Sequence, residues 1–188
     1  FAVIDAVRKL AGPPQHKMYA KMVLRATGQK EYWPITDEDV ESYAEAEKQL
    51  TDLWPLIPQA SIQSGYNTNQ VLNYHYRQWH QMFNARQLVA LALLSREIAR
   101  LPTRPLKMLF ACLLSGTLEF NNMFASFKGE GTGAVRNMFA HHILKPELMP
   151  LEANVWGTPK SSGSFSTLIE SRVMRMLDYK AQPFELKI

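Results

Sequence analysis

The strongest constraint on the fold is a segment near the middle of the chain that combines a helix-start signal with a helical repeat of apolar residues. Asn84 is a favoured capping residue, and Gln87 follows it at the third helical position, where its side chain can bond back to the cap. Phe83 precedes the cap and can pack on Leu88 across the first turn. The apolar period continues to about Arg100, which predicts a long helix with one buried side.

Three further segments have helical character. Thr36 begins a capping box, and the helix that follows is expected over residues 37–53 with a largely solvated face. Residues 103–120 are apolar nearly all round, which predicts the central helix of the core. Ser164 or Ser166 caps the last helix, which has its own apolar side.

Before these helices, alternating residues predict two strands, one over residues 1–7 and one over 18–25, joined through a glycine–proline turn. Two strands alone are marginal in water, so the hairpin must lie on helices or join another sheet. We therefore expect an α+β fold that is predominantly α-helical, with an N-terminal β-hairpin and about four main helices joined by long irregular connections. Residues 1–188 form a single domain or a fragment of a larger protein, with a hairpin region over 1–35 and a helical region over 36–188.

Bulk properties place the chain among ordinary globular proteins. It has 188 residues, 46% hydrophobic and 20% charged, and no apolar run approaches the roughly 18 residues of a membrane span. The N-terminus has no signal-peptide pattern, so we expect a cytoplasmic protein that does not contact a membrane. The net charge of +4 permits a polyanionic partner without requiring one. Both ends of the sequence suggest a piece cut from a longer polypeptide, whose remainder would be a partner.

Metal binding is not indicated by the residue pattern. The single cysteine, Cys112, lies in an apolar helical pattern and is expected to be a buried, inert thiol. His141 and His142 lie near Glu147 and Glu152, but adjacent histidines point in different directions and no known ligand spacing is present. Structural histidines or contacts to a partner explain the pair better.

A glycine-rich run at residues 129–133 could in principle cradle a phosphate through its backbone N–H groups. The sequence does not continue with the Lys-Ser or Lys-Thr of a phosphate-binding loop, so a flexible loop is the better interpretation. Lys128 and Arg136 flank the run and could contact a nucleic-acid backbone.

Aromatic and basic side chains alternate in the long connection before the helix that Asn84 caps. The set comprises Tyr66, Tyr74, Tyr76, Trp79 and Phe83 together with Arg77, His80 and Arg86. Aromatic faces can stack bases while arginines hold phosphates, so the mixture suits nucleic acid. The alternative is that the aromatic residues pack the connection onto the helix. No nucleophile–base pair can be picked out, so no catalytic residue is assigned.

Several short blocks, in their order along the chain, resemble the large bacterial DNA methylase family. The blocks are Gly65-Tyr66, Tyr74-His75-Tyr76, Trp79 with Phe83-Asn84-Ala85-Arg86-Gln87-Leu88, Asn121-Asn122, residues 141–147, residues 150–157, Ser162-Gly163-Ser164-Phe165, and Tyr179 with Pro183-Phe184-Glu185. The resemblance covers roughly residues 60–188 and extends more loosely over the first 55. Members are similar to amino-group DNA methyltransferases, which transfer a methyl group from S-adenosylmethionine to an exocyclic base nitrogen.

The resemblance implies a fragment that lacks the family's glycine-rich cofactor loop, zinc ribbon and Asp/Asn-Pro-Pro-Tyr/Phe tetrapeptide. S-adenosylmethionine would bind the parent protein, and no cofactor is expected on this fragment alone. The fragment is expected to be inactive alone and to position DNA or brace the catalytic domain. The candidate DNA contacts are Arg77, Arg86, Gln87, Lys128, Arg136, His141 and Lys145. A structural or protein-interaction module without DNA contact is the alternative, and an independent enzyme with its site in residues 121–163 is a third, weaker one.

Overall fold

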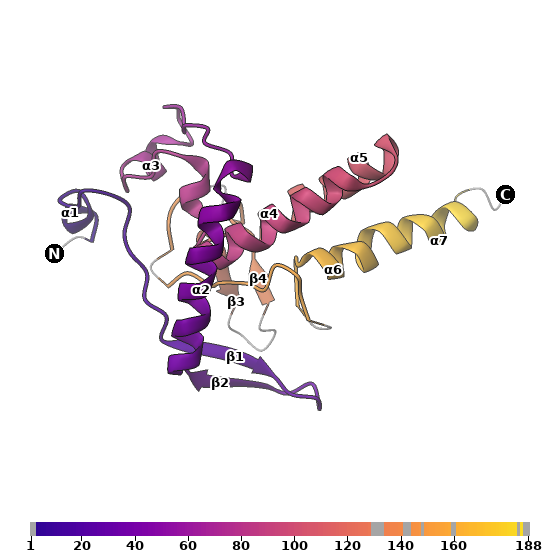
Figure 1. The fold of residues 1–188 in the computed structure, drawn as a ribbon, viewed down its shortest axis with the longest axis horizontal. Coiled ribbons are helices and arrows are strands. Elements are labelled where there is room, and N and C mark those ends of the chain that lie inside the picture. The colour runs from indigo at the N-terminus through magenta and orange to yellow at the C-terminus, as the bar shows by residue number, and fades with distance from the viewer. Residues whose placement is uncertain are drawn as a thin grey trace.

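The computed structural model describes residues 3–128, 134–140, 144–147, 149–158, 161–183 and 185. Over these residues the fold is α+β and mostly helical, with two small antiparallel sheets (Figure 1). The elements in chain order are α1 (Val3–Val7), β1 (Ala20–Leu24), β2 (Lys30–Pro34), α2 (Asp37–Leu53), η1 (Trp54–Leu56), α3 (Asn69–Leu72), η2 (Trp79–Met82), α4 (Ala85–Arg100), α5 (Arg104–Leu118), β3 (Ser126–Lys128), β4 (Ala134–Arg136), α6 (Phe165–Leu168), η3 (Ile169–Met174) and α7 (Arg175–Ala181). The expected fold class is confirmed, because the long helical segments are α2, α4, α5 and the continuous run from α6 through η3 to α7.

The two strongest helix starts form as their sequences predict. Asn84 Oδ1 accepts a hydrogen bond from the Gln87 backbone at 2.9 Å, and Gln87 Oε1 accepts one from the Asn84 backbone at 3.1 Å. At the start of α2, the Asp39 carboxylate accepts hydrogen bonds from the backbone and the hydroxyl of Thr36, at 2.8 and 2.9 Å. These bonds satisfy N–H groups that the first turn of a helix leaves free. Phe83 packs into the same core cluster as Leu88, as the expected staple requires.

Helix α4, rather than α5, is the central helix. It packs against α2 on one side and α5 on the other, and seven of its residues are buried: Ala85, Gln87, Leu88, Val89, Leu91, Ala92 and Ile98. In α5 only Leu113, Gly116 and Thr117 are buried, and Cys112 is exposed. The expectations of a central 103–120 helix and of a buried thiol were therefore wrong. A helix can be apolar all round and still find packing partners, here α4 and α6, on only part of its circumference.

The N-terminal hairpin exists, but its strands differ from those expected. Residues 18–25 do contain a strand, β1, whose partner is β2, with Leu24 opposite Lys30 and Gly28 in the turn at φ +81°. The expected strand over residues 1–7 is wrong, since Val3–Val7 forms α1. Seven residues are too few for alternation to be told from a helical period. The true partner strand begins after the turn at Gly28, a signal that the prediction passed over.

The hairpin rests on the helical part of the molecule, as a two-stranded ribbon requires. Lys21 of β1 forms an ion pair with Asp39 of α2 at 2.6 Å. Tyr32 of β2 makes an edge-to-face contact with Phe127 of β3, with ring centroids 6.2 Å apart. In the part of the chain that the structure describes, no helix has the length and apolarity needed to cross a membrane.

The long connection between α2 and α4 is folded rather than open. Its residues Ile62, Val71 and Tyr76 join Phe124 and Leu144 in a buried cluster. The Tyr76 and Phe124 rings meet edge to face at 5.0 Å. The connection therefore packs against Phe124 and Leu144, and Met82 and Phe83, just before α4, belong to the same cluster.

Candidate functional site

Arg86 lies at the centre of a four-way junction in the first turn of α4. Its Nε and Nη2 donate to the two carboxylate oxygens of Glu152, at 2.8 and 2.7 Å, in a bidentate pair. Nη2 also lies 3.0 Å from the sulfur of Met18. The guanidinium carbon is 5.2 Å from the centre of the Tyr43 ring in α2, within cation–π range. Arg86 thus joins the segment before β1, helix α2, helix α4 and the 149–158 segment.

Both members of the ion pair are mostly removed from solvent. The Arg86 side chain is 31% exposed and that of Glu152 is 25% exposed. Burial raises the pKa of the Tyr43 phenol, and the nearby Glu47 and Glu152 carboxylates act in the same direction, against a hydrogen bond with the Ala85 backbone. Tyr43 is therefore neutral at physiological pH and offers its ring face to the guanidinium. The geometry is that of a brace between segments.

Gln87 is a core residue and not a surface contact. It is 1% exposed, and its Oε1 completes the capping box with Asn84. Its Nε2 is buried and makes no hydrogen bond to the residues that the structure describes. A side chain this deeply buried is poorly placed for a direct DNA contact, which stays a prediction for Gln87. The capping box with Asn84 gives a structural reason for a glutamine directly after Arg86.

The next resembling blocks also serve to hold segments together. Asn121 Nδ2 donates to the carbonyls of Thr117 and Gly163, at 2.9 and 3.0 Å, which ties the end of α5 to the turn before α6. Asn122 Nδ2 donates to the Leu118 carbonyl at 2.7 Å, and its Oδ1 accepts from the Phe124 backbone at 2.9 Å. The bond from Asn122 serves a carbonyl in the last turn of α5, and the Thr117 carbonyl also accepts from the backbone N–H groups of Phe120 and Asn121.

Residues 150–157 are fastened to the start of α6 by backbone bonds. Phe165 N–H donates to the Val155 carbonyl at 2.8 Å, and Ser166 N–H donates to that of Trp156 at 3.1 Å. The ring of Trp156 stacks on that of Phe165 at 6.2 Å. Blocks that lie far apart in the sequence therefore meet in one connected region of the fold.

The remaining candidate residues lie apart from this junction. Arg77 is exposed, and its Nη1 donates to the Leu72 carbonyl at 2.7 Å, which closes the turn after α3. Arg136 is exposed on β4, opposite Ser126 in the register, while Lys128 ends β3. Lys145 is exposed at the edge of the molecule. Within the described ranges, no hydrogen bond or ion pair joins Arg77, Arg136 and Lys145 to one another.

Two of the expected features lie outside the residues that the structure describes. These are His141, with its neighbour His142, and the glycine-rich run at 129–133. The described strands before and after the run, β3 and β4, pair antiparallel.

The aromatic residues of the long connection divide between packing and exposure. Tyr76 is buried in the core, and burial raises its pKa to about 12. Phe83 packs against the Leu88 cluster, and the Trp54 ring meets His80 edge to face at 5.0 Å. Only Tyr66 of the set is almost fully presented to solvent, at 97% exposure. Of the two interpretations of these aromatic residues, packing therefore holds for Tyr76 and Phe83.

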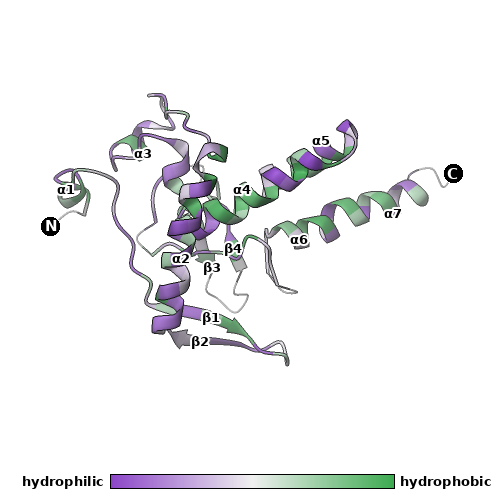
Figure 2. Cartoon of the chain, viewed as in Figure 1, coloured by the Kyte–Doolittle hydropathy of each residue, from purple (hydrophilic) through white to green (hydrophobic). Residues whose placement is uncertain are grey.

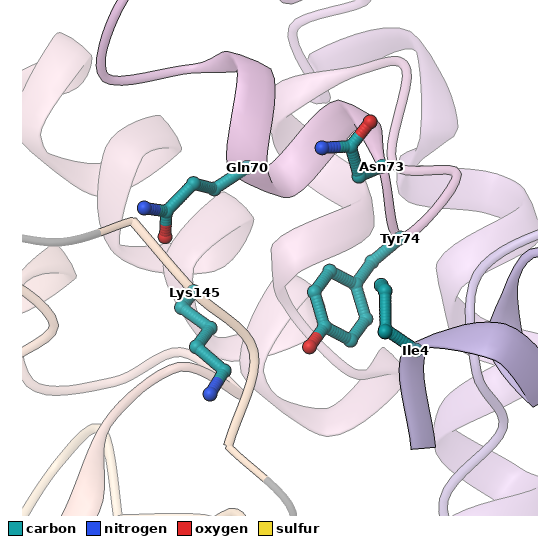
Figure 3. Close-up of a pocket in the computed structure, with 5 residues that line it drawn as sticks. All are labelled: Ile4, Gln70, Asn73, Tyr74 and Lys145. Atoms are coloured by element: carbon teal, nitrogen blue, oxygen red, sulfur yellow. The ribbon is translucent and has the colours of Figure 1, made fainter. Parts of the chain in front are cut away.

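A shallow surface pocket of about 380 Å³ lies beside the candidate Lys145. Figure 3 shows the Tyr74 ring next to Ile4 and, around them, the amides of Gln70 and Asn73 and the ammonium of Lys145. The lining has no carboxylate, histidine or thiol, so it offers no acid–base pair. Lys145 is the one charged side chain in this lining.

Many nucleotide-type cofactors bind where a strand leads through a glycine-rich turn into a helix, and the described elements do not include such a turn. The four described strands form two separate antiparallel ribbons, and β2 leads into α2 through Ile35-Thr36, which contains no glycine. Among the described residues, no group of three or more His, Cys, Asp or Glu could hold a metal ion.

The Glu152 partner of Arg86 is the residue that the sequence could not identify. The two residues lie 66 positions apart, and Glu152 stood out only as one of the glutamates near the histidine pair. A single sequence carries no signal for such a pairing. Comparison of the chain with protein-family models, curated proteins and solved structures found no match.

Proposed function

We propose that this chain is a non-catalytic part of an S-adenosylmethionine-dependent DNA methyltransferase that modifies the amino group of adenine or cytosine. In this proposal the chain braces the catalytic domain and helps to position DNA in the cytoplasm. The order of the resembling blocks supports the family. The bidentate Arg86–Glu152 pair carries the bracing role, because it joins two of those blocks across 66 residues.

In this proposal the residues of the resembling blocks have different tasks. Arg86 and Gln87 are turned inward, one to an ion pair and one to a capping box, so they hold the α4 start in place. Asn121 and Asn122 hold the end of α5 in the same way. Contact with DNA is left to exposed cations such as Arg136 and Lys145, which have no ion pair in the described part of the chain. The cofactor and the reacting base would be held by the rest of the parent protein.

The test is methyl transfer by the parent polypeptide that contains these residues. The purified protein is incubated with duplex DNA and S-adenosylmethionine carrying a labelled methyl group, and the digested nucleosides are analysed by mass spectrometry. We expect N6-methyladenine or N4-methylcytosine, and no transfer by the 188-residue chain alone. A parent that methylates neither base under any tested sequence overturns the proposal.

A charge-swap experiment tests the bracing role separately. Glu152→Arg combined with Arg86→Glu restores an ion pair of reversed polarity, whereas each single change leaves like charges together. We expect both single variants of the parent to lose activity and stability, and the double variant to recover part of both. If Arg86→Glu lowers DNA affinity without lowering stability, Arg86 is a DNA contact and the brace is wrong. If all variants methylate DNA equally and are equally stable, the Arg86–Glu152 pair is not a brace, while the proposed methyltransferase function stands.

A further inference from the structure

Four cations gather at the end of the hairpin that α4 and α5 form. Arg96 and Arg100 lie in the last two turns of α4, and Arg104 and Lys107 lie in the first turn of α5. The two helices pack against each other and are joined by residues 101–103, so these side chains share one end of the pair. Figure 1 shows this end, here called the tip, projecting away from α2.

The tip has more positive charge than its own acids can balance. Glu97 is the single carboxylate between residues 96 and 107. Its Oε1 accepts hydrogen bonds from Arg96 at 3.2 Å and from Arg100 at 2.9 Å, so one acid serves two arginines. Arg104 and Lys107 are exposed, and neither has an ion pair among the described residues. The tip therefore keeps an excess of three positive charges in a chain whose net charge is +4.

Helix α2, which packs on the half of α4 that lies away from the tip, holds seven of the 17 acidic residues of the chain. Helix α2 carries Asp37, Glu38, Asp39, Glu41, Glu45, Glu47 and Asp52 with Lys48 as its one cation, and it is largely hydrophilic in Figure 2. It packs on the first half of α4, around Leu88 and Ala92. Arg100 lies 14 residues beyond Arg86, about 21 Å along the helix. This separation exceeds the Debye length of about 8 Å, so salt screens the repulsion between a polyanion at the tip and the carboxylates of α2.

We propose that the tip is a sequence-independent contact for the phosphate backbone of duplex DNA. The choice of DNA as the polyanion rests on the proposed function. Long arginine and lysine side chains at the end of a helix pair suit phosphates, which carry most non-specific affinity. No aromatic residue lies between 96 and 107, so the tip has no platform for unstacked bases. Backbone contact with a duplex therefore fits better than single-strand binding.

The salt dependence of binding measures the number of phosphate contacts. Each contact adds about 0.9 to the slope of log K against log salt, so four contacts predict a slope near −3.6 and about a 150-fold loss of affinity between 50 and 200 mM salt. The triple variant Arg100→Gln, Arg104→Gln, Lys107→Gln leaves one contact. We expect its slope to be about −0.9 and its loss over the same range to be about 3.5-fold.

The experiment is fluorescence anisotropy of the 188-residue chain with a labelled random-sequence duplex of about 20 base pairs, repeated at several salt concentrations. The matched control is the triple variant Lys9→Gln, Lys17→Gln, Lys48→Gln, which removes the same charge from exposed residues away from the tip. We expect the control to keep the slope of the unchanged protein. Circular dichroism and sedimentation of each variant verify that fold and oligomeric state are unchanged.

Other outcomes would contradict the inference or the proposed function. Equal losses in both triple variants mean that net charge, and not the tip, drives binding. Tighter binding of a single strand or of RNA refutes the commitment to duplex DNA. If only the tip variant alters sedimentation while duplex binding persists, the tip is an interface between copies. If the parent methylates DNA but the tip variant keeps the salt slope of the unchanged protein, only this inference is refuted. If the tip binds duplex DNA but the parent transfers no methyl group, only the proposed function is refuted.

Discussion

Removing the Arg86 charge should destabilise the protein through one identifiable partner, Glu152. Arg86→Met keeps much of the side-chain volume and removes two charge-assisted hydrogen bonds of 2.7 and 2.8 Å. Hydrogen bonds to charged groups contribute about 1.5–3 kcal/mol, and charges about 4 Å apart near a surface attract by about 4 kcal/mol. Solvent reaches about a third of each side chain and screens this attraction. We expect a coupling free energy between Arg86 and Glu152 of about 1.5 kcal/mol.

The single change also costs the contact with Tyr43 and leaves the Glu152 carboxylate without its partner. The cation–π contact adds roughly 0.5–1 kcal/mol, so Arg86→Met should lower the free energy of unfolding by about 2–2.5 kcal/mol. A domain of this size loses about 2–4 °C in melting temperature per kcal/mol, which gives a fall of roughly 6 °C.

A double-mutant cycle separates the coupling from the other costs. Arg86→Met, Glu152→Gln and the double variant are unfolded in urea and followed by circular dichroism, with the slope of each transition compared. The control cycle uses the exposed Glu45–Lys48 pair of α2, whose atoms lie 3.5 Å apart and whose coupling should not exceed about 0.5 kcal/mol. A coupling for Arg86–Glu152 no larger than that of the control would refute the brace.

Further predictions test local features of the fold. Asn84→Ala should lower the free energy of unfolding in urea by about 1 kcal/mol through loss of the cap, and Asn84→Asp should retain it. Gly163→Ala adds a Cβ that overlaps the Phe120 ring at a backbone φ of +69°, so a melting temperature lowered by several degrees is expected and an unchanged one contradicts the packing. The Lys21 ion pair, with hydrogen bonds from Thr36, lowers the pKa of Asp39 from 3.8 to about 2. Because the folded pKa is depressed, this stabilisation is present above about pH 4 and is lost as pH falls toward 2, and Asp39→Asn should abolish that part of the pH dependence.

The bracing role explains why residues that suit DNA recognition can be turned inward. Arg86 follows an aromatic-rich connection, and in isolation that arrangement favours a nucleic-acid contact. In the fold, the nearest anion to Arg86 is a carboxylate of the same chain, so its charge is already matched. Exposed cations without an ion pair among the described residues include Arg104 and Lys107, in a stretch that the resemblance does not single out. The tip can be seen in the sequence as four cations against one acid between residues 96 and 107, but only the packing of α4 on α5 places them together.

The parts of the fold that the sequence predicts are those with local causes. The start of α2 at Thr36 and the start of α4 at Asn84 depend on side chains that bond to backbone groups three residues away. Such contacts form whatever the rest of the chain does. The four long helical segments follow from apolar periods and caps of this kind, and the general class of the fold follows from them.

The tertiary structure alone decided which helix is central, where the first strand begins and what Arg86 binds. An apolar period says that a face is buried but does not name its partner, so α5 has the more apolar sequence while α4 has the more buried position. The Arg86–Glu152 pair depends on 66 intervening residues that return the 149–158 segment to α4. Contacts of this range have energies that no local pattern encodes, because both partners must first be placed by packing elsewhere. The sequence determined where the helices start, and the packing determined which charges they leave for a partner.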